Sequence, residues 1–287
     1  MTNHSKTAFV FAGGGSLGAV QVGMLKALQA ARIEPELVAG VSVGSINAYC
    51  FACQPDAQGL AFLERLWRRL SRSDIFPSPG MLGLLRILGS RNYLIQPDRL
   101  ARLLRQQLPS SDLGATRIPC HVTATDALTG LSVTWSQGPA APALLASAAI
   151  PAIFPPVTIE GRTLIDGGFA HQAPFEAVVA AGATRLYVLP TGYSCARPKV
   201  PASVLGAALN ALNMLTVSKL IASIRHYAAQ VEVHVVPPLC PLDVTPLDFR
   251  QTGALIDRAE SQTAEWLSRG AGKDELVPPQ LVPHVHA

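Results

Sequence analysis

Two glycine-flanked side chains in this sequence are of the residue types that acyl-ester chemistry needs. The first is Ser42, in the motif Gly40–Gly44 (GVSVG), between an apolar run at 37–41 that predicts a strand and a segment at 45–53 that predicts a helix. A serine on a tight strand-to-helix turn adopts strained backbone angles, and flanking glycines leave room for that turn. The turn lifts the hydroxyl above the sheet edge, at a helix N-terminus that favours a developing anion. This pattern indicates a nucleophile.

A serine hydroxyl needs a base, and the sequence offers an aspartate more clearly than a histidine. His121 lies in an apolar run and is interpreted as a core residue, and no local context marks the others as a triad base: His4, His171, His226, His234, His284 and His286. Asp166 follows a short predicted strand, 163–165, and precedes two glycines. We expect that strand to be parallel to its neighbours, and parallel sheets place their sites at the carboxyl edge.

A glycine-rich turn near the amino terminus supplies a third part of the site. The run Gly13–Gly18 (GGGSLG) ends a predicted strand at 7–12 and opens a predicted helix. Three turns therefore converge on one edge of the sheet. The backbone N–H groups of a glycine turn can approach a tetrahedral oxyanion closely and stabilise it.

Taken in this order, GGGSLG, GVSVG and DGG resemble the patatin-like phospholipase family, and Ser147–Pro156 resembles the segment that precedes DGG in that family. The resemblance covers Thr7 to Leu189. It implies hydrolysis of acyl esters in lipids, of the phospholipase A, lysophospholipase or carboxylesterase type, by Ser42 as nucleophile and Asp166 as general base, with no cofactor and no metal. The oxyanion hole would be formed by Gly13, Gly14, Gly15 and the N–H of Val43, and the remaining motif glycines are Gly18, Gly40, Gly44, Gly167 and Gly168.

Two positions depart from the family pattern. Leu17 stands where the family has Arg or Lys, and the missing charge is expected to lower the rate or alter head-group preference. The family also has Asn-x-Pro shortly after DGG, where this chain has His171 to Pro174. Whether His171 assists the chemistry is left open.

The elements that must position these turns predict the fold class. Two strand–turn–helix units in succession indicate an α/β fold with a mainly parallel central sheet and helices on both faces. Further strands are predicted at 118–126, 131–135, 185–189 and 231–236, and further helices at 57–72, 97–108, 140–149 and 173–181. We expect a catalytic core at 7–190, a mostly helical part at 191–276 packed on the same domain, and a disordered tail at 277–287. The apolar segment Met81–Ile95 is a candidate lid or acyl-chain wall, or an ordinary core helix.

Composition favours contact with lipid and argues against contact with nucleic acid. The 287 residues are 49% hydrophobic and 15% charged, which suits a lipid-facing surface or a dimer interface, and the oligomeric state is left open. The arginines between 65 and 72 lie at helical spacing, on a solvated face or one that meets anionic lipid, and no aromatic-interleaved basic stripe appears. The apolar stretch Val204–Ile224 contains four polar residues, so a buried or interfacial helix is favoured over a membrane span.

The five cysteines, with no visible export signal, predict reduced thiols and a cytoplasmic protein with peripheral membrane contact. Cys50 and Cys53 form a C-x-x-C pair that we interpret as two core cysteines on one helix, because no second pair completes a zinc site. No metal-ligand cluster is visible elsewhere.

Three other functions are weighed against the hydrolase. An acyltransferase would use the same serine, and a non-catalytic relative would bind lipid without cutting it. In the third, Gly13, Gly15 and Gly18 match a dinucleotide-binding fingerprint, with Glu34 or Glu36 as the ribose contact. That reading leaves GVSVG and DGG unexplained.

Overall fold

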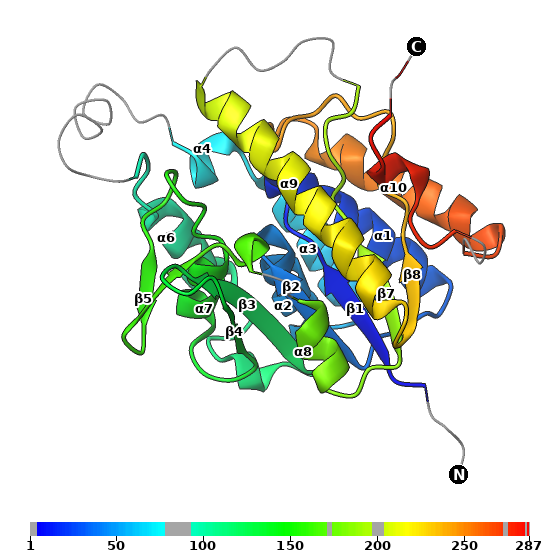
Figure 1. Ribbon diagram of the computed structural model, residues 1–287, viewed down its shortest axis with the longest axis horizontal. Helices are drawn as coiled ribbons and strands as arrows, with labels where there is room; N and C mark the ends of the chain where they lie inside the picture. The colour runs from blue at the N-terminus through cyan, green and yellow to red at the C-terminus, as the bar shows by residue number, and fades with distance from the viewer. Residues whose placement is uncertain are drawn as a thin grey trace.

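A computed structural model describes residues 5–77, 93–170, 174–196, 204–271, 275–284 and 286. Its centre is an eight-stranded sheet (Figure 1). Seven strands pair in the order β5-β6-β3-β2-β1-β7-β8, and the eighth, β4, also pairs with β3. The strands are β1 (Thr7–Phe11), β2 (Leu37–Val41), β3 (Cys120–Asp126), β4 (Ser132–Trp135), β5 (Val157–Ile159), β6 (Arg162–Ile165), β7 (Arg185–Leu189) and β8 (Glu232–Val235). Strands β3, β2, β1, β7 and β8 run parallel, and β4, β5 and β6 pair antiparallel. The predicted α/β class with a mainly parallel sheet is confirmed.

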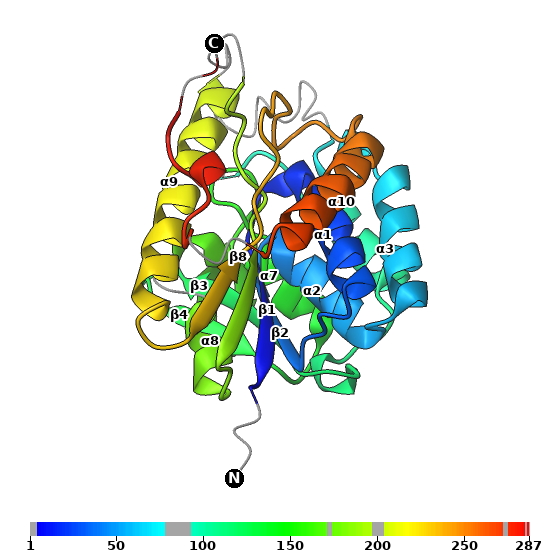
Figure 2. The same cartoon turned by 90° about the vertical axis from the view of Figure 1, so that its right-hand side faces the viewer.

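Helices cover both faces of the sheet, because the buried strands are apolar on both sides. Phe9 and Phe11 on β1 face a core shared with the helices on one side, and Ala8 and Val10 face a second core under α8 and α9. Figure 2 shows α9 on one side of the sheet and α1, α2, α3 and α10 on the other. The α-helices are α1 (Ala19–Ala30), α2 (Val43–Cys53), α3 (Ala57–Arg69), α4 (Arg72–Ile75), α6 (Asp98–Gln107), α7 (Ala140–Ser147), α8 (Phe175–Ala180), α9 (Val204–Tyr227) and α10 (Thr252–Ser268).

Helix α9 crosses the second face of the sheet and leaves much of its own surface uncovered (Figure 1). Its segment Gly206–Ala228 has the length and the mean hydropathy, 1.4, of a candidate membrane span. In this fold Ile224 and Tyr227 are buried against the sheet. Met214 and Leu215 are 56% and 52% exposed. The helix therefore has one side in the core and an apolar outer side.

The carboxyl-terminal tail differs from the disorder expected of it. Residues Pro279–Leu281 form a short 3₁₀ helix, and the side chain of Leu281 is 1% exposed. Leu281 belongs to the same core cluster as Ile224 and Val235. Burial of this leucine holds the tail on the domain. The expected division into a catalytic core at 7–190 and a mostly helical part at 191–276 stays a prediction. Strand β8, which pairs with β7, lies in the second part.

Candidate active site

The strand-to-helix turn expected at Ser42 is present between β2 and α2. Ser42 has φ 54° and ψ −133°, a strained conformation for a residue with a side chain. A Cβ atom on Gly40 would lie 2.5 Å from the carbonyl oxygen of Gly44, and one on Gly44 would lie 2.5 Å from that of Phe11. Both positions therefore require glycine, and the motif spacing follows from the tightness of the turn.

Hydrogen bonds from α7 and α2 hold this turn in place. The Ser42 N–H donates to Ser147 Oγ at 3.0 Å, and that hydroxyl donates to the Thr123 carbonyl at 2.6 Å. The Ser45 hydroxyl donates to the Ser42 carbonyl at 2.6 Å. Ser147, which opens the segment that resembles the family before DGG, thus fixes the nucleophile's backbone. No pattern close to Ser42 in the sequence pointed to this role.

The register of β3 brings Ser42 and Asp166 together. Thr123 pairs with both Val41 on β2 and Thr134 on β4, so β2 and β4 lie on opposite edges of β3. Thr125 pairs with residues of β4 and β6, so β6 must lie on the same edge as β2. Strands β2 and β6 therefore approach from opposite directions along one edge of β3. Their ends, which carry Ser42 and Asp166, meet beside Ala124.

The expectation that Asp166 ends a parallel strand was wrong, because β6 is antiparallel to β3. Strand β6 runs towards β2 along the edge of β3, so Asp166 reaches the carboxyl end of the parallel strands from the opposite direction. Strand β3 extends three residues beyond the last partner of β2, and β6 occupies this extension. A Cβ atom on Gly167 would lie 2.1 Å from the Thr123 carbonyl oxygen, so the glycine after the aspartate permits this close approach.

The Asp166 carboxyl group is almost fully buried, with 5% of the residue exposed. Its Oδ1 accepts the Gly168 N–H at 2.8 Å, and Thr125 Oγ1 donates to its backbone carbonyl at 2.8 Å. Oδ2 has no hydrogen-bond partner among the described residues. Burial raises the pKa of Asp166 to about 6, although the Ser42 hydroxyl and the Gly168 N–H lower it. The Ser42 hydroxyl is therefore close enough to the Asp166 carboxyl group to lower its pKa, although the two groups do not form a hydrogen bond of good geometry. Catalytic hydrogen bonds commonly tighten only when substrate binds.

The glycine turn packs directly against Ser42, the candidate nucleophile. A Cβ atom on Gly13 would lie 3.0 Å from Ser42 Cβ, and Gly15 has φ 60°. The N–H groups of Gly13 and Gly14 donate to no backbone or side-chain acceptor in the part of the chain that the structure describes. Such free donors beside a serine are what a tetrahedral oxyanion requires.

Two segments beyond β7 and β8 hold the glycine turn from outside. Thr191 Oγ1 donates to the Gly13 carbonyl at 2.6 Å, and a Cβ atom on Gly14 would lie 2.1 Å from that Thr191 oxygen. The Ser16 N–H donates to the Pro246 carbonyl at 2.8 Å. The conformation of the turn therefore depends on residues far beyond it in the chain.

Two other motif positions have packing roles. A Cβ atom on Gly18 would lie 2.8 Å from Val43 Cγ2, so this glycine lets the starts of α1 and α2 approach. Leu17 is fully buried in the main core. Leu17 lines neither pocket that contains Ser42, and the expected effect of the missing charge stays a prediction.

Ser42, Asp166 and the three glycines line one pocket, together with residues of α9 that include Leu209 and Thr216. A second, strongly apolar pocket also reaches Ser42 and runs between α3, α4, α6 and the segment after α7. We call it the acyl pocket; it is lined by Leu66, Trp67, Leu70, Ile75, Phe76, Leu100, Leu103, Leu104, Ile150, Phe154 and Phe249, among others.

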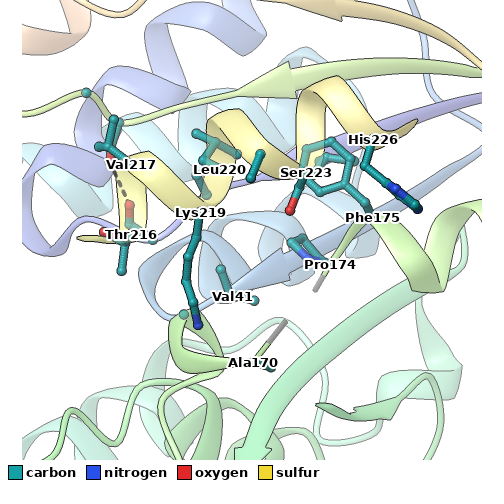
Figure 3. A pocket seen from close by; sticks show the side chains of 17 residues that line it. Val41, Ala170, Pro174, Phe175, Thr216, Val217, Lys219, Leu220, Ser223 and His226 are labelled. Atoms are coloured by element: carbon teal, nitrogen blue, oxygen red, sulfur yellow. Dashed lines mark hydrogen bonds between the residues drawn. The ribbon is translucent and has the colours of Figure 1, made fainter. Parts of the chain in front are cut away.

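A third pocket lies on the other face of the sheet, under α9 (Figure 3). In Figure 3 the Lys219 side chain extends from α9 towards the loop that contains Ala170. Its Nζ donates to the carbonyl oxygen of Phe169, three residues after Asp166. Burial lowers the pKa of Lys219. This lysine anchors the turn that carries the candidate base, and in the sequence it is only a polar interruption of an apolar stretch.

In the described part of the chain, neither a histidine nor Cys50 or Cys53 lines the pocket that holds both Ser42 and Asp166. His121 is on β3, and burial lowers its pKa, while His171 lies outside the described residues. Cys50 and Cys53 are both on α2 and both contribute to the main core, as expected.

The structure also bears on two further expectations from the sequence, which concern dinucleotide binding and metal ligands. Glu36 N–H donates to the Thr7 carbonyl, at the opposite end of the parallel strands from the glycine turn. That placement removes the ribose contact on which dinucleotide binding depended. The expected absence of a metal-ligand cluster was wrong, because Cys195, Cys240, His284 and His286 lie together.

Comparisons with known proteins identify the family of this chain. A family model described as Patatin-like phospholipase matches residues 9–179. An uncharacterised NTE family protein of Mycobacterium tuberculosis is 28% identical over 181 residues, covering 62% of this chain and 47% of that protein. A lysophospholipase of Mycosarcoma maydis is 24% identical over 193 residues, covering 64% of this chain and 9% of that protein. This chain thus spans less than half the length of either relative.

Among solved structures, VipD from Legionella pneumophila aligns with a TM-score of 0.47 and 14% identity, covering 92% of this chain and 67% of that one. Since the family model spans more than half of the residues, the resemblance seen in the three motifs is confirmed: the chain belongs to the patatin-like phospholipase family.

Proposed function

We propose that this protein is a serine acyl-ester hydrolase that acts on lipids through Ser42 and Asp166. One observation carries the proposal. The strained turn of Ser42 lies beside the same pocket as Asp166 Oδ2 and the N–H groups of Gly13 and Gly14. Among the residues that the structure describes, neither that oxygen nor those two N–H groups have a hydrogen-bond partner. This is the combination of nucleophile, base and oxyanion donors that acyl transfer needs.

In the first half of the reaction Asp166 Oδ2 accepts the Ser42 proton while Oγ attacks the ester carbonyl carbon. The carbonyl oxygen becomes an oxyanion that accepts the N–H groups of Gly13 and Gly14, with Gly15 and Val43 as further donors. When the intermediate collapses, the carbon–oxygen ester bond breaks and Asp166 returns the proton to the leaving alcohol. The acyl group remains on Ser42.

In the second half a water molecule takes the place of the alcohol. Asp166 accepts a proton from it, and the oxygen attacks the acyl carbon. Collapse of this intermediate releases a fatty acid, and the proton on Asp166 returns to Ser42 Oγ. A pKa of about 6 leaves most of the carboxyl ionised at neutral pH and still basic enough to accept a proton.

The acyl pocket supports a lipid substrate. It begins at Ser42, and apart from Ser42, Asn47 and Gln107 its lining side chains are apolar or glycine. Burial of each methylene of an acyl chain there is worth about 0.8 kcal/mol, which favours long chains. The lid expected at Met81–Ile95 lies mostly outside the described residues and stays a prediction; Ile95 itself is buried and pairs with the Ile153 carbonyl.

The outer side of α9 supports contact with a membrane surface. Leu209, Leu212 and Thr216 line the pocket with Ser42, and the exposed Met214 and Leu215 lie on the same segment of helix. An apolar helix side beside the pocket opening would enter the interfacial region of a bilayer and bring ester groups to the serine. The basic cluster contributes less, since Arg68 is paired with Glu64 and Asp257.

The test is a panel of phospholipids, lysophospholipids and short p-nitrophenyl esters, with labelling by a fluorophosphonate. Ser42→Ala and Asp166→Asn should each abolish turnover, and only Ser42→Ala should abolish labelling through loss of the attacking atom. Ser261→Ala, an exposed serine on α10, is the matched control and should retain both. Activity that survived Ser42→Ala would rule the proposal out. Product analysis with an added alcohol separates a hydrolase from an acyltransferase.

A further inference from the structure

Four metal-binding side chains meet at a place that takes no part in the proposed ester chemistry. Cys195 follows β7, Cys240 lies between β8 and α10, and His284 and His286 lie close to the end of the chain. Their ligand atoms all lie within 4.8 Å of one another. None of the four lines either pocket that contains Ser42. We propose that they bind one Zn²⁺ ion in a closed structural site.

Five of the six distances between the ligand atoms are close to the edges of a zinc tetrahedron. With Zn–S near 2.3 Å and Zn–N near 2.0–2.1 Å, its edges are about 3.8 Å for S–S, about 3.5 Å for S–N and about 3.4 Å for N–N. The Sγ atoms of Cys195 and Cys240 are 3.8 Å apart, and the Nε2 atoms of His284 and His286 are 3.0 Å apart. Cys240 Sγ lies 3.2 Å from His284 Nε2 and 3.5 Å from His286 Nε2, and His286 Nε2 lies 3.3 Å from Cys195 Sγ.

Hydrogen bonds alone do not account for this packing. His284 Nδ1 lies 2.7 Å from the Val282 carbonyl oxygen, which can only accept, so Nδ1 carries the proton. In the neutral ring Nε2 is then bare and faces the cluster. The Sγ atoms of Cys195 and Cys240 and the Nε2 atom of His286 can carry at most one proton each. At most three protons are therefore available for the five close contacts among the four ligand atoms. A cation, in contrast, attracts the lone pairs of all four atoms at once.

The surroundings hold the ligands in place. The Ala196 N–H donates to the Leu242 carbonyl at 3.0 Å, which joins the segments of Cys195 and Cys240. Tyr193 Oη donates to the Val282 carbonyl at 3.1 Å, and Leu281 anchors the tail in the core. Partners that fix a ligating imidazole and its tautomer are typical of protein metal sites.

The donor set selects the metal and its role. Thiolate and imidazole ligands in tetrahedral arrangement favour Zn²⁺, and four protein ligands leave no open position for water or substrate. The ion would join segments that also hold the glycine turn, because Thr191 and Pro246 contact Gly13 and Ser16. The metal therefore stabilises the oxyanion turn from a distance and takes no part in bond breaking.

The test measures metal directly and does not depend on activity. The 287-residue chain, produced with zinc and a reducing agent, should contain about one zinc per chain by mass spectrometry of the metal. His286→Ala and Cys240→Ser should lose it, while His226→Ala and Cys53→Ser, matched residues outside the cluster, should retain it. Removal of zinc from the unsubstituted protein by a strong chelator should lower the melting temperature by about 5 °C or more, reversibly, and expose Cys195 and Cys240 to alkylation.

Replacement by Co²⁺ should give the intense visible absorption of a tetrahedral thiolate site, and His286→Ala should abolish it. Three results would overturn the proposal. One is protein that binds no zinc in competition with a chromophoric chelator. Another is a mass lower by two hydrogens with Cys195 and Cys240 joined in a disulfide under these reducing conditions. The third is zinc that persists in both cluster variants.

Discussion

Replacement of Asp166 by asparagine should abolish turnover and also make the protein more stable above pH 6. Asparagine has nearly the same shape, and its side-chain oxygen can still accept the Gly168 N–H, but it carries no charge. The buried carboxylate oxygen of Asp166 has no partner among the described residues, so its ionisation in the folded protein is unfavourable. The substitution removes this cost together with the base.

The magnitude follows from the pKa of Asp166, which is raised from 3.8 to about 6. Between these values the folded protein holds a proton that the unfolded chain has released, so stability falls as pH rises through this window and is constant above it. Two pKa units at 1.36 kcal/mol each give about 3 kcal/mol. For a chain of this size that corresponds to about 6 °C in melting temperature.

The assay compares melting temperatures of Asp166→Asn and the unsubstituted protein from about pH 4.5 to about pH 7.5. The difference should grow in favour of the variant across this range. Asp126→Asn is the control, since backbone N–H groups of Thr129 and Leu128 lower the pKa of this exposed carboxyl. Asp126→Asn should lower the melting temperature by an amount that does not vary across this range, because the stability that comes from a pKa below 3.8 is lost only as the pH falls below that value. A difference for Asp166→Asn that did not vary with pH would refute a buried, ionised Asp166.

Four further predictions concern activity. The kcat/KM of the hydrolase should fall below pH 6 as Asp166 becomes protonated, measured with a short ester whose binding is independent of pH. Leu103→Trp, which narrows the acyl pocket, should lower kcat/KM for long-chain esters more than for short ones, whereas Arg102→Trp on the exposed side of α6 should affect both equally. Lys219→Met should lower kcat on the order of tenfold at little change in KM, because it releases the turn that carries the base. Gly14→Ala should lower kcat on the order of a hundredfold by displacing an oxyanion donor, with fluorophosphonate labelling slowed in parallel.

The local parts of this architecture could be predicted from the sequence. Strands β2 and β7 have the bounds that their apolar runs indicated, and the turn at Ser42 follows from Gly40, whose Cβ atom would collide with the backbone of Gly44. In each case the physical reason for the local structure lies within a short stretch of chain. Hydrophobic period and steric demand are local properties, and a single sequence displays them.

The parts that could not be predicted depend on contacts between distant segments. The direction of β6 is set by its pairing with the end of β3, and apolar composition does not encode direction. Cys240 is separated by 45 residues from Cys195 and by 44 from His284, so no zinc-ligand spacing appears. The sequence offered two signals for the metal site: the H-x-H pair of His284 and His286, and the cysteines Cys195 and Cys240. The tail was expected to be disordered because of its prolines, and its composition gives no sign that Leu281 is buried in the core.

The meeting of β2 and β6 at one edge of β3 has a consequence for how activity arises. If Asp166 is the base, as proposed, a nascent chain whose turn at Ser42 has already folded lacks its proton acceptor until more than a hundred further residues have been added and packed. In the proposed mechanism, a fragment that ends before β6 has no base for Ser42 and would not hydrolyse esters. Activity would then depend on completion of the tertiary structure.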